Sequence, residues 1–127
     1  MSSTLEVGKK LVELLSQHKA LEAVDTLYGA DIVCIEPQAG PDGKREMHGI
    51  AAIRGKNEWW VNNHNIHEML VNGPWPHDDR FIVHFKLDVT ATGGPMKGKR
   101  FGMEETGLYT VKHGKIVKEE YFYHMQM

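Results

Sequence analysis

The chain has 127 residues, 41% of them hydrophobic and 25% charged, with a formal net charge of −2 at pH 7, so we expect one domain over residues 1–127. Lysines and arginines never run longer than two, which excludes the basic footprint of a nucleic-acid-binding protein. No apolar run approaches the roughly 18 residues of a membrane span, and residues 1–10 lack the hydrophobic stretch of a signal peptide, so we expect a soluble, cytoplasmic protein without membrane partners.

The first part of the chain has the spacing of two helices. From Thr4 to about His18, apolar residues recur every three or four positions, with polar residues on the opposite face. A second apolar stripe runs from Ala20 to Tyr28 and stops at Gly29, a residue typical of helix ends. The two segments predict a helical hairpin.

The next segments predict a short strand and a third helix. The β-branched stretch "DIVCIEP" ends in Pro37, which cannot donate to a sheet, so the strand ends at Glu36. Cys34 inside it is expected to be a buried small hydrophobic residue, and one cysteine allows no disulfide within the chain. After a loop, residues 49–64 return to helical spacing.

Four strands follow the third helix, at residues 66–71, 81–92 and 101–112 and at the end of the chain. The order ααβαββββ predicts an α+β domain with helices on one face of a curved sheet. In residues 81–89 the apolar residues alternate strictly and fix an inner face that includes Phe85. The outer face is mixed, and we expect it to form a homodimer interface.

This arrangement resembles the NTF2-like or SnoaL-like superfamily. The resemblance rests on the helical hairpin, the acid–Pro strand end, "GIAAIR" opening the third helix and "GKIVKEE" in the last strand, and it spans Leu5 to Tyr123. It implies a cystatin/NTF2-like cone, in which three N-terminal helices pack on a curved, mainly antiparallel sheet around one pocket. The superfamily includes ketosteroid isomerases, polyketide cyclases, a dehydratase and epoxide hydrolases, and also proteins that only bind, so the fold leaves the function open.

The resemblance places Glu36 where the isomerases have their general base. A carboxylate in an apolar pocket can have a raised pKa suited to proton transfer. The alternative is that Glu36 forms a salt bridge with Lys44 or Arg45. The tyrosine and aspartic acid of the isomerase oxyanion hole fall near Val12 and Gly107, so both donors are absent and steroid isomerisation by that mechanism is not expected.

The last two strands supply further candidates. In the superfamily the alternation of Val117, Glu119, Tyr121 and Tyr123 faces the pocket, where a phenol can donate to a carbonyl oxygen and a carboxylate can orient a hydroxyl or a water. The alternative is ordinary packing aromatics and a structural ion pair for Glu119. Glu105 shares the parity of Met103, Gly107 and Tyr109, and Gly107 would leave space beside it.

Residues of the third helix complete the expected site. Ile53, Asn57 and Trp60 lie on one stripe and are expected to line the pocket, together with Phe85, while Trp59 faces the pocket or covers its rim. Eight histidines raise the possibility of a metal site, but only His64 and His67 lie close together and no third ligand is spaced with them. We therefore expect neither a metal nor a cofactor.

Together these observations predict a protein that binds a small, mostly apolar, oxygenated molecule. If the protein is an enzyme, Glu36, Glu105, Glu119 and Tyr121 would carry cofactor-free acid/base isomerisation, cyclisation or dehydration. Epoxide hydrolysis is a weaker variant, because no arginine lies clearly on a pocket-facing position. The main alternative is a non-catalytic ligand-binding or protein-interaction domain, and a third is a structural homodimer whose cone is filled by Trp60, Tyr121 and Tyr123.

Overall fold

The structure is a computed structural model that describes residues 3–126, with the side chains of residues 124–126 outside the description. Its helices are α1 (Thr4–Ser16), α2 (Ala20–Leu27) and α3 (Ile50–Asn62). Helix α1 begins where the Ser3 hydroxyl oxygen accepts a hydrogen bond from the Glu6 backbone N–H at 3.1 Å. Its buried residues are Val7, Gly8, Leu11 and Leu14, so Gly8 and Leu11 of the expected stripe Leu5, Gly8, Leu11, Val12 and Leu15 are buried, whereas Leu5 is exposed.

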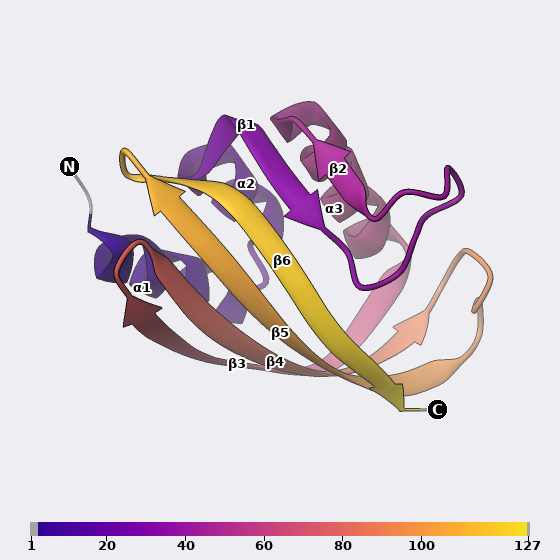
Figure 1. Ribbon diagram of the computed structural model, residues 1–127. Coiled ribbons are helices and arrows are strands. Elements are labelled where there is room, and N and C mark those ends of the chain that lie inside the picture. The colour runs from indigo at the N-terminus through magenta and orange to yellow at the C-terminus, as the bar shows by residue number, and fades with distance from the viewer. Residues whose placement is uncertain (1–2, 127) are drawn as a thin grey trace.

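Six strands form one curved, unclosed sheet in the order β2-β1-β6-β5-β4-β3. The strands are β1 (Tyr28–Ile35), β2 (Glu46–His48), β3 (His64–His77), β4 (Arg80–Ala91), β5 (Arg100–Lys112) and β6 (Lys115–Gln126). Only the β1–β6 pair is parallel. The three helices lie together on one side of the sheet (Figure 1). The predicted α+β architecture is confirmed.

Three details differ from the sequence prediction. Tyr28 begins β1 in an extended conformation and does not end α2. The short strand β2, within the expected loop, pairs antiparallel with β1. Strand β3 continues through the turn-rich residues 72–77 and pairs as far as His77–Arg80. Prolines are tolerated there because β3 is an edge strand with one unpaired side.

The inner face of the sheet carries the core. The alternating residues of β4 from Phe81 to Val89 are buried, as the sequence predicted. In β6 a bulge changes the alternation, because Val111 pairs with Ile116 while Thr110 pairs with Lys118. Ile116 is therefore fully buried, and Val117 is the extra residue. The expectation that Val117 continues the inward set of Glu119 is wrong for this reason.

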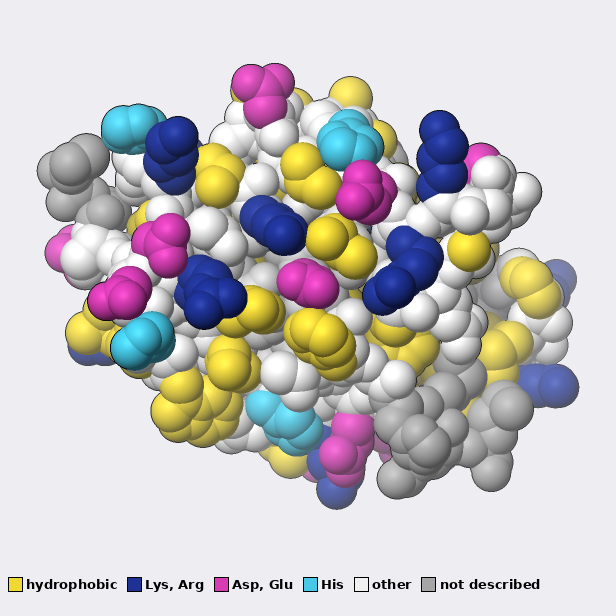
Figure 2. All heavy atoms as spheres, in the orientation of Figure 1, with side chains coloured by type: hydrophobic (Ala, Val, Ile, Leu, Met, Phe, Trp, Pro, Cys, Tyr) yellow, Lys and Arg dark blue, Asp and Glu magenta, His cyan; other side chains and the backbone are white. Residues whose placement is uncertain are grey.

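The outer face of the sheet is mixed, as predicted. Large hydrophobic side chains are exposed on β3, β4 and β6, namely Leu70, Trp75, Ile82 and Phe122. Figure 2 shows hydrophobic side chains dispersed among basic, acidic and histidine side chains on the side where β5 and β6 lie in front of the helices. Among the described residues, no helix is long and apolar enough to cross a membrane.

Candidate functional site

The deepest polar group on the inner face is Glu119 of β6, whose side chain is fully buried. Its Oε2 accepts hydrogen bonds from the hydroxyls of Tyr28 and Tyr121, both at 2.6 Å. The Tyr121 hydroxyl also lies 3.3 Å from that of Tyr109. Burial, and then the charge of Glu119, raise the pKa of all three tyrosines well above the ordinary value. The three phenols therefore stay protonated, and those of Tyr28 and Tyr121 donate to the Glu119 carboxylate.

Lys56 of α3 connects Glu119 to the more open part of the site. Its Nζ lies 2.9 Å from Glu36 Oε1, 3.2 Å from Cys34 Sγ and 3.5 Å from Glu119 Oε1. The same atom lies 5.1 Å from the centre of the Tyr121 ring. Burial alone would lower the pKa of Lys56, but the charges of Glu119 and Glu36 outweigh it and raise that pKa, so the side chain is an ammonium.

Glu36 lies just after β1, and about a quarter of its side chain is exposed. Its position is fixed through the backbone, because its N–H donates to the Arg45 carbonyl and its carbonyl accepts from Arg45 Nε, both at 2.8 Å. The carboxylate pairs with Lys56 and not with Lys44 or Arg45, which was the alternative considered from the sequence. The Cys34 thiol lies 3.4 Å from Glu36 Oε1.

Burial raises the pKa of the Cys34 thiol far above its ordinary value. Cys34 is fully buried in the core, as the sequence predicted, and its sulfur stays protonated. A protonated, buried thiol is a poor nucleophile, so this cysteine does not add a covalent chemistry to the site.

Glu105 of β5 is the third inward carboxyl group. It pairs across the sheet with Phe85 on one side and with Tyr123 on the other. Burial first, and then the charge of Glu36, raise the pKa of Glu105 to about 8. The same two causes, burial and then Glu36, raise the pKa of Tyr123. At pH 7 the site therefore holds a neutral carboxylic acid at Glu105 near an ionic pair at Glu36 and Lys56.

Gly107 does not leave free space beside Glu105. A Cβ at this position would lie 2.7 Å from the Tyr109 ring, because that ring lies across the glycine. The Tyr109 ring also stacks on Phe81 with a centroid distance of 5.0 Å. On the inner face of the sheet Tyr28, Tyr109 and Glu119 are thus buried, whereas Tyr121 and Tyr123 remain partly exposed.

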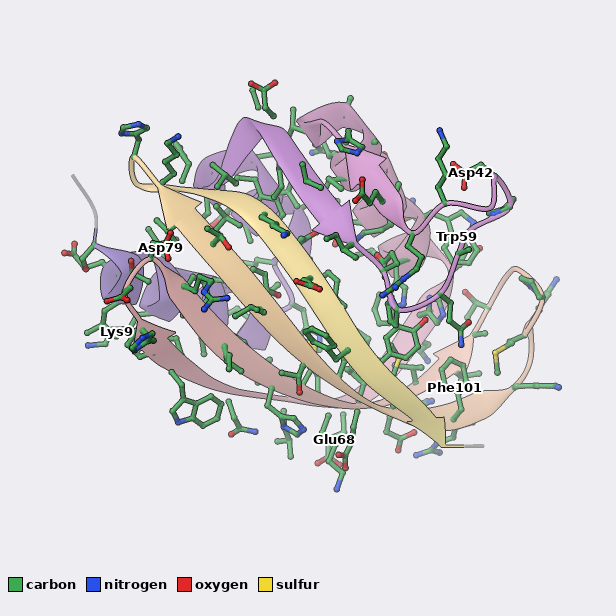
Figure 3. All side chains as sticks on the ribbon, in the orientation of Figure 1. Lys9, Asp42, Trp59, Glu68, Asp79 and Phe101 are labelled. Carbon is green, nitrogen blue, oxygen red and sulfur yellow. The ribbon has the colours of Figure 1, made fainter. Side chains whose placement is uncertain are left out.

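The third-helix candidates have different roles. Ile53 is fully buried in the core, and the Asn57 side-chain amide donates to the Ile53 carbonyl of its own helix at 2.9 Å. Trp60 is partly buried and stacks on His64 at 4.4 Å. Trp59 is 49% exposed and lies against Gly94. Figure 3 shows Trp59 and Phe101 at the end of the sheet where the loops after β1 and β4 project.

Apolar residues adjoin the carboxyl groups on the same inner face. Phe85, beside Glu105, and Leu87, beside Met103, are both buried, and Met103 is partly buried. Phe101 follows at the beginning of β5. The inner face therefore has a polar part formed by Glu36, Lys56, Glu105 and Tyr121 and an apolar part formed by these side chains.

The two histidines considered as metal ligands contact different partners. His64 Nδ1 lies 2.8 Å from the Trp60 carbonyl, and His67 Nε2 lies 2.6 Å from Thr90 Oγ1. Within residues 3–126, no group of three or more His, Cys, Asp or Glu side chains has the geometry to hold a metal ion.

Two surface hollows are lined by residues other than the inward carboxyl groups. One, of about 460 Å³, lies between α1, the end of α2 and the β5–β6 turn, and includes Lys10 and His113. The other, of about 480 Å³, lies across β3, β4 and β5 and includes Asp88 and Arg100. Both are lined by exposed charged side chains, so the inner face is the stronger candidate on chemical grounds.

Sequence reasoning missed three of the central residues, Lys56, Tyr28 and Tyr109. Lys56 is not among the candidates expected from the third helix, although it lies three residues after the buried Ile53 and so on the same helix face. Tyr28 was assigned to a helix, and Tyr109 was noted only for its parity. One signal could have identified Lys56. It is a lysine one turn after a buried residue, in a helix that packs on a strand ending in an acidic residue.

The comparisons with known proteins agree with this fold. A family model described as a SnoaL-like domain matches residues 2–123. A structure from Mesorhizobium loti is 38% identical to this chain, with a TM-score of 0.86. It is provisionally named a SnoaL-like polyketide cyclase, with carbohydrate phosphatase in brackets in the name. The match covers 96% of this chain and 100% of that one. No curated protein matches the chain.

More distant structures share the fold alone. A Bacillus subtilis protein, provisionally named an isomerase, is 14% identical with a TM-score of 0.75, and the match covers 97% of this chain and 90% of that one. A Xanthomonas campestris protein of unknown function with a cystatin-like fold is 13% identical with a TM-score of 0.75, and the match covers 96% of this chain and 91% of that one.

Proposed function

Since this chain belongs to the SnoaL-like domain family, we propose that it binds a small, mostly apolar, oxygenated molecule and transfers a proton on it without a cofactor. The reaction class is isomerisation, cyclisation or dehydration next to a carbonyl group. One observation carries the proposal: two inward carboxyl groups, Glu36 and Glu105, have contrasting environments on one face of the sheet. Such a pair supplies a base and an acid at the same pH.

Glu36 is the base in this proposal. Lys56 and the Cys34 thiol both contact its Oε1, and among the described residues its Oε2 has no hydrogen-bond partner. This oxygen would take a proton from the carbon next to the substrate carbonyl. Because about a quarter of the Glu36 side chain is exposed, a ligand can approach it.

Glu105 is the acid. A pKa of about 8 leaves it protonated at neutral pH, so it can donate to the carbonyl oxygen as the neighbouring carbon loses its proton. The electron pair of the broken C–H bond then moves toward that oxygen and gives an enol, which is the intermediate that isomerisation and cyclisation share. Tyr121, at the edge of the same region, is not a second donor, because its one hydroxyl hydrogen already goes to Glu119 Oε2.

The apolar part of the inner face supports an apolar ligand body. Phe85, Leu87 and Met103 continue from Glu105 toward Phe101, so a molecule whose oxygen meets Glu105 would place its hydrocarbon part against these side chains. Trp60, partly buried on α3, would cover it from the helix side. A neutral ligand fits best, because an anion would meet the carboxylates of Glu36 and Glu119.

A ligand screen followed by isotope exchange tests the proposal. Purified protein would be screened by thermal shift against cyclic ketones, polyketide fragments, terpenoid epoxides and fatty acids. A ligand at a hundredfold excess over its Kd stabilises the folded state by about 2.7 kcal/mol, which is readily visible. The ligands that bind would then be incubated with the protein in D2O, and deuterium incorporation next to the carbonyl would be followed by mass spectrometry.

Variants distinguish the outcomes. Glu36→Gln and Glu105→Gln should both abolish exchange while the ligand still binds, and Glu104→Gln, on the opposite side of β5 and 46% exposed, should behave as wild type. Binding without exchange in the wild type would make the protein a non-catalytic binding domain, which is the alternative function. Exchange that neither inward variant alters would place the reacting part of the ligand elsewhere and overturn the proposal.

A further inference from the structure

We propose that His64, the first residue of β3, is a further ligand-binding residue whose ring nitrogen Nε2 accepts a hydrogen bond from a hydroxyl group of the ligand. This hydroxyl would lie at the end of the ligand remote from the carbonyl group that meets Glu105. The placement of that carbonyl rests on the proposed function. The hydrogen-bonding state of His64 is a property of the protein without a ligand, so it can be tested separately.

His64 lies on the inner face, at the end of the sheet where Figure 3 shows Trp59 and Phe101. It pairs directly with Ala91 of β4, and residues opposite each other in an antiparallel pair project to the same face. Ala91 is the last member of the alternating buried set of β4, so the His64 side chain projects to the buried side. The apolar part of the inner face, which ends at Phe101, therefore continues to His64.

Three aromatic rings hold the imidazole in one orientation. The His64 ring is nearly parallel to that of Trp60, with an interplanar angle of 15° and a centroid distance of 4.4 Å. Trp59 and Phe101 meet the imidazole edge-on, with centroid distances of 5.9 and 6.3 Å. Trp59 is itself held closely, since a Cβ at Gly94 would lie only 2.9 Å from its ring. Packing between α3, β5 and the β4–β5 loop thus fixes the imidazole.

One hydrogen bond decides which ring nitrogen of His64 is the donor. Nδ1 lies 2.8 Å from the Trp60 carbonyl oxygen, and a carbonyl oxygen can only accept. Nδ1 therefore carries a hydrogen, so in the neutral ring Nε2 carries the lone pair. Among the described residues Nε2 has no hydrogen-bond partner. An acceptor that is held among aromatic rings without a protein donor is suited to a donor from a ligand.

The hydrogen bond to Trp60 also has a structural role. The Trp60 carbonyl belongs to the last turn of α3, where carbonyl groups lack helical partners, and a histidine side chain can satisfy one of them. This role uses Nδ1 alone and leaves Nε2 available. A purely structural role of His64 therefore predicts that ligand binding does not depend on a hydroxyl hydrogen.

The two polar ends of the inner face define the class of ligand. Phe101 and Glu105 are four residues apart on β5, which is about 13 Å along a strand. The surface between them is apolar and includes Leu87 and Met103. A ligand that meets both ends is an elongated, neutral molecule with a carbonyl at one end and an alcohol or phenol hydroxyl at the other. A methoxy group in place of that hydroxyl would bring two lone pairs together and weaken binding.

Nitrogen-15 NMR of the histidine rings tests the first step without a ligand. Long-range proton–nitrogen spectra at pH 8.5, where ordinary imidazoles are neutral, distinguish a nitrogen that carries hydrogen from one that carries a lone pair. The His64 signals, assigned with His64→Phe, should show the hydrogen on Nδ1 and the lone pair on Nε2. A hydrogen on Nε2 instead would overturn the inference.

A pair of small probes, 4-methylphenol and its methyl ether, tests the second step. Indole N–H signals locate the binding, because Trp59 and Trp60 contact His64 whereas Trp75 is 55% exposed on the outer face. 4-Methylphenol should shift the Trp60 signal and not the Trp75 signal, and its Kd should be about tenfold lower than that of the ether. Equal Kd values, or an unshifted Trp60 signal up to the solubility limit of the phenol, would contradict the inference.

Two variants separate the acceptor from the ring. His64→Phe keeps an aromatic ring and removes the acceptor, so the ratio of the two Kd values should fall from about ten to about one. His67→Gln, an exposed histidine on the same strand, should keep the wild-type ratio. A ratio that stays near ten in folded His64→Phe would refute a role for Nε2. If His64→Phe does not fold, the wild-type spectrum and the wild-type ratio decide.

The two proposals fail in different ways. If the probes behave as expected but no ligand shows isotope exchange, the role of His64 in binding stands and only the proposed proton transfer fails. If ligands show exchange but 4-methylphenol and its ether bind equally well, the proposed function stands and the role of His64 is rejected.

Discussion

Glu105 should make the protein less stable as the pH rises. Its pKa is about 8 in the folded protein and near 4.5 for an ordinary glutamate, which represents the unfolded chain. Below pH 4.5 the group is protonated in both states and has no effect. Between the two values the folded protein keeps a proton that the unfolded chain releases, so a rising pH favours unfolding. Above pH 8 both states are ionised and the loss is complete.

The size of the effect follows from the two values. Each pH unit inside this window lowers the free energy of unfolding by about 1.4 kcal/mol. Between pH 5 and pH 8 the integrated loss from Glu105 is about 3 to 4 kcal/mol, allowing for the gradual titration at both ends. That is a large part of the 5–15 kcal/mol typical of a domain. Glu105→Gln, which mimics the protonated acid, should remove this dependence.

Urea denaturation at pH 5, 6.5 and 8 measures the effect. Wild type and Glu105→Gln should have similar free energies of unfolding at pH 5, and the variant should be more stable by about 3 to 4 kcal/mol at pH 8. Glu104→Gln, the exposed neighbour, should follow the wild-type curve. Parallel curves for wild type and Glu105→Gln would show that the Glu105 carboxyl group is ionised in the folded protein at neutral pH, and the reasoning about the acid would fail.

Three further substitutions test other parts of the structure. Tyr28→Phe removes a 2.6 Å hydrogen bond to Glu119 and should lower the free energy of unfolding by about 2 kcal/mol in urea denaturation. Gly107→Ala places a Cβ 2.7 Å from the Tyr109 ring and should cost about 1–3 kcal/mol, measured the same way. Because we propose that the outer sheet face forms a homodimer, Phe122→Lys, at a side chain 50% exposed there, should shift sedimentation from dimer to monomer.

Matched controls accompany each of these substitutions. Tyr123→Phe should change stability little, because its hydroxyl has no hydrogen bond within the described residues, and an equal loss in both tyrosine variants would contradict the importance of the Glu119 contact. Gly55→Ala lies in α3 with open space around it and should stabilise the protein by about 0.5–1 kcal/mol. Leu5→Lys, exposed on α1, should leave sedimentation unchanged, and a monomeric wild type would refute the dimer.

Much of the framework could be predicted from the sequence because it depends on local patterns. The alternation of apolar and polar residues along β4 predicted which of its side chains are buried, because helices cover only one face of the sheet. The same rule gave the inward position of Glu105, and the parity of Glu119, Tyr121 and Tyr123 held beyond the bulge. The strand expected at residues 66–71 continues through residues 72–77, because pairing with β4 outweighs the turn tendency of their prolines and glycine.

The bulge in β6 shows where local reasoning ends. Whether the alternation of a strand changes at one residue depends on its partners, here Thr110 and Val111 of β5. No residue type in β6 indicates this change of alternation. It explains why Ile116 enters the core together with Glu119, although the two residues have opposite parity in the sequence.

The sequence by itself determined which groups the site could contain, because strand parity places carboxyl groups and tyrosines on the inner face. Only the tertiary structure decided their chemistry. Lys56 is 20 residues from Glu36 and 63 from Glu119, and it meets them because α3 packs on β1, whose neighbour in the sheet is β6. The protonation of a buried carboxyl group depends on the nearest charges and on burial, and both are set by packing between segments that are distant in the chain.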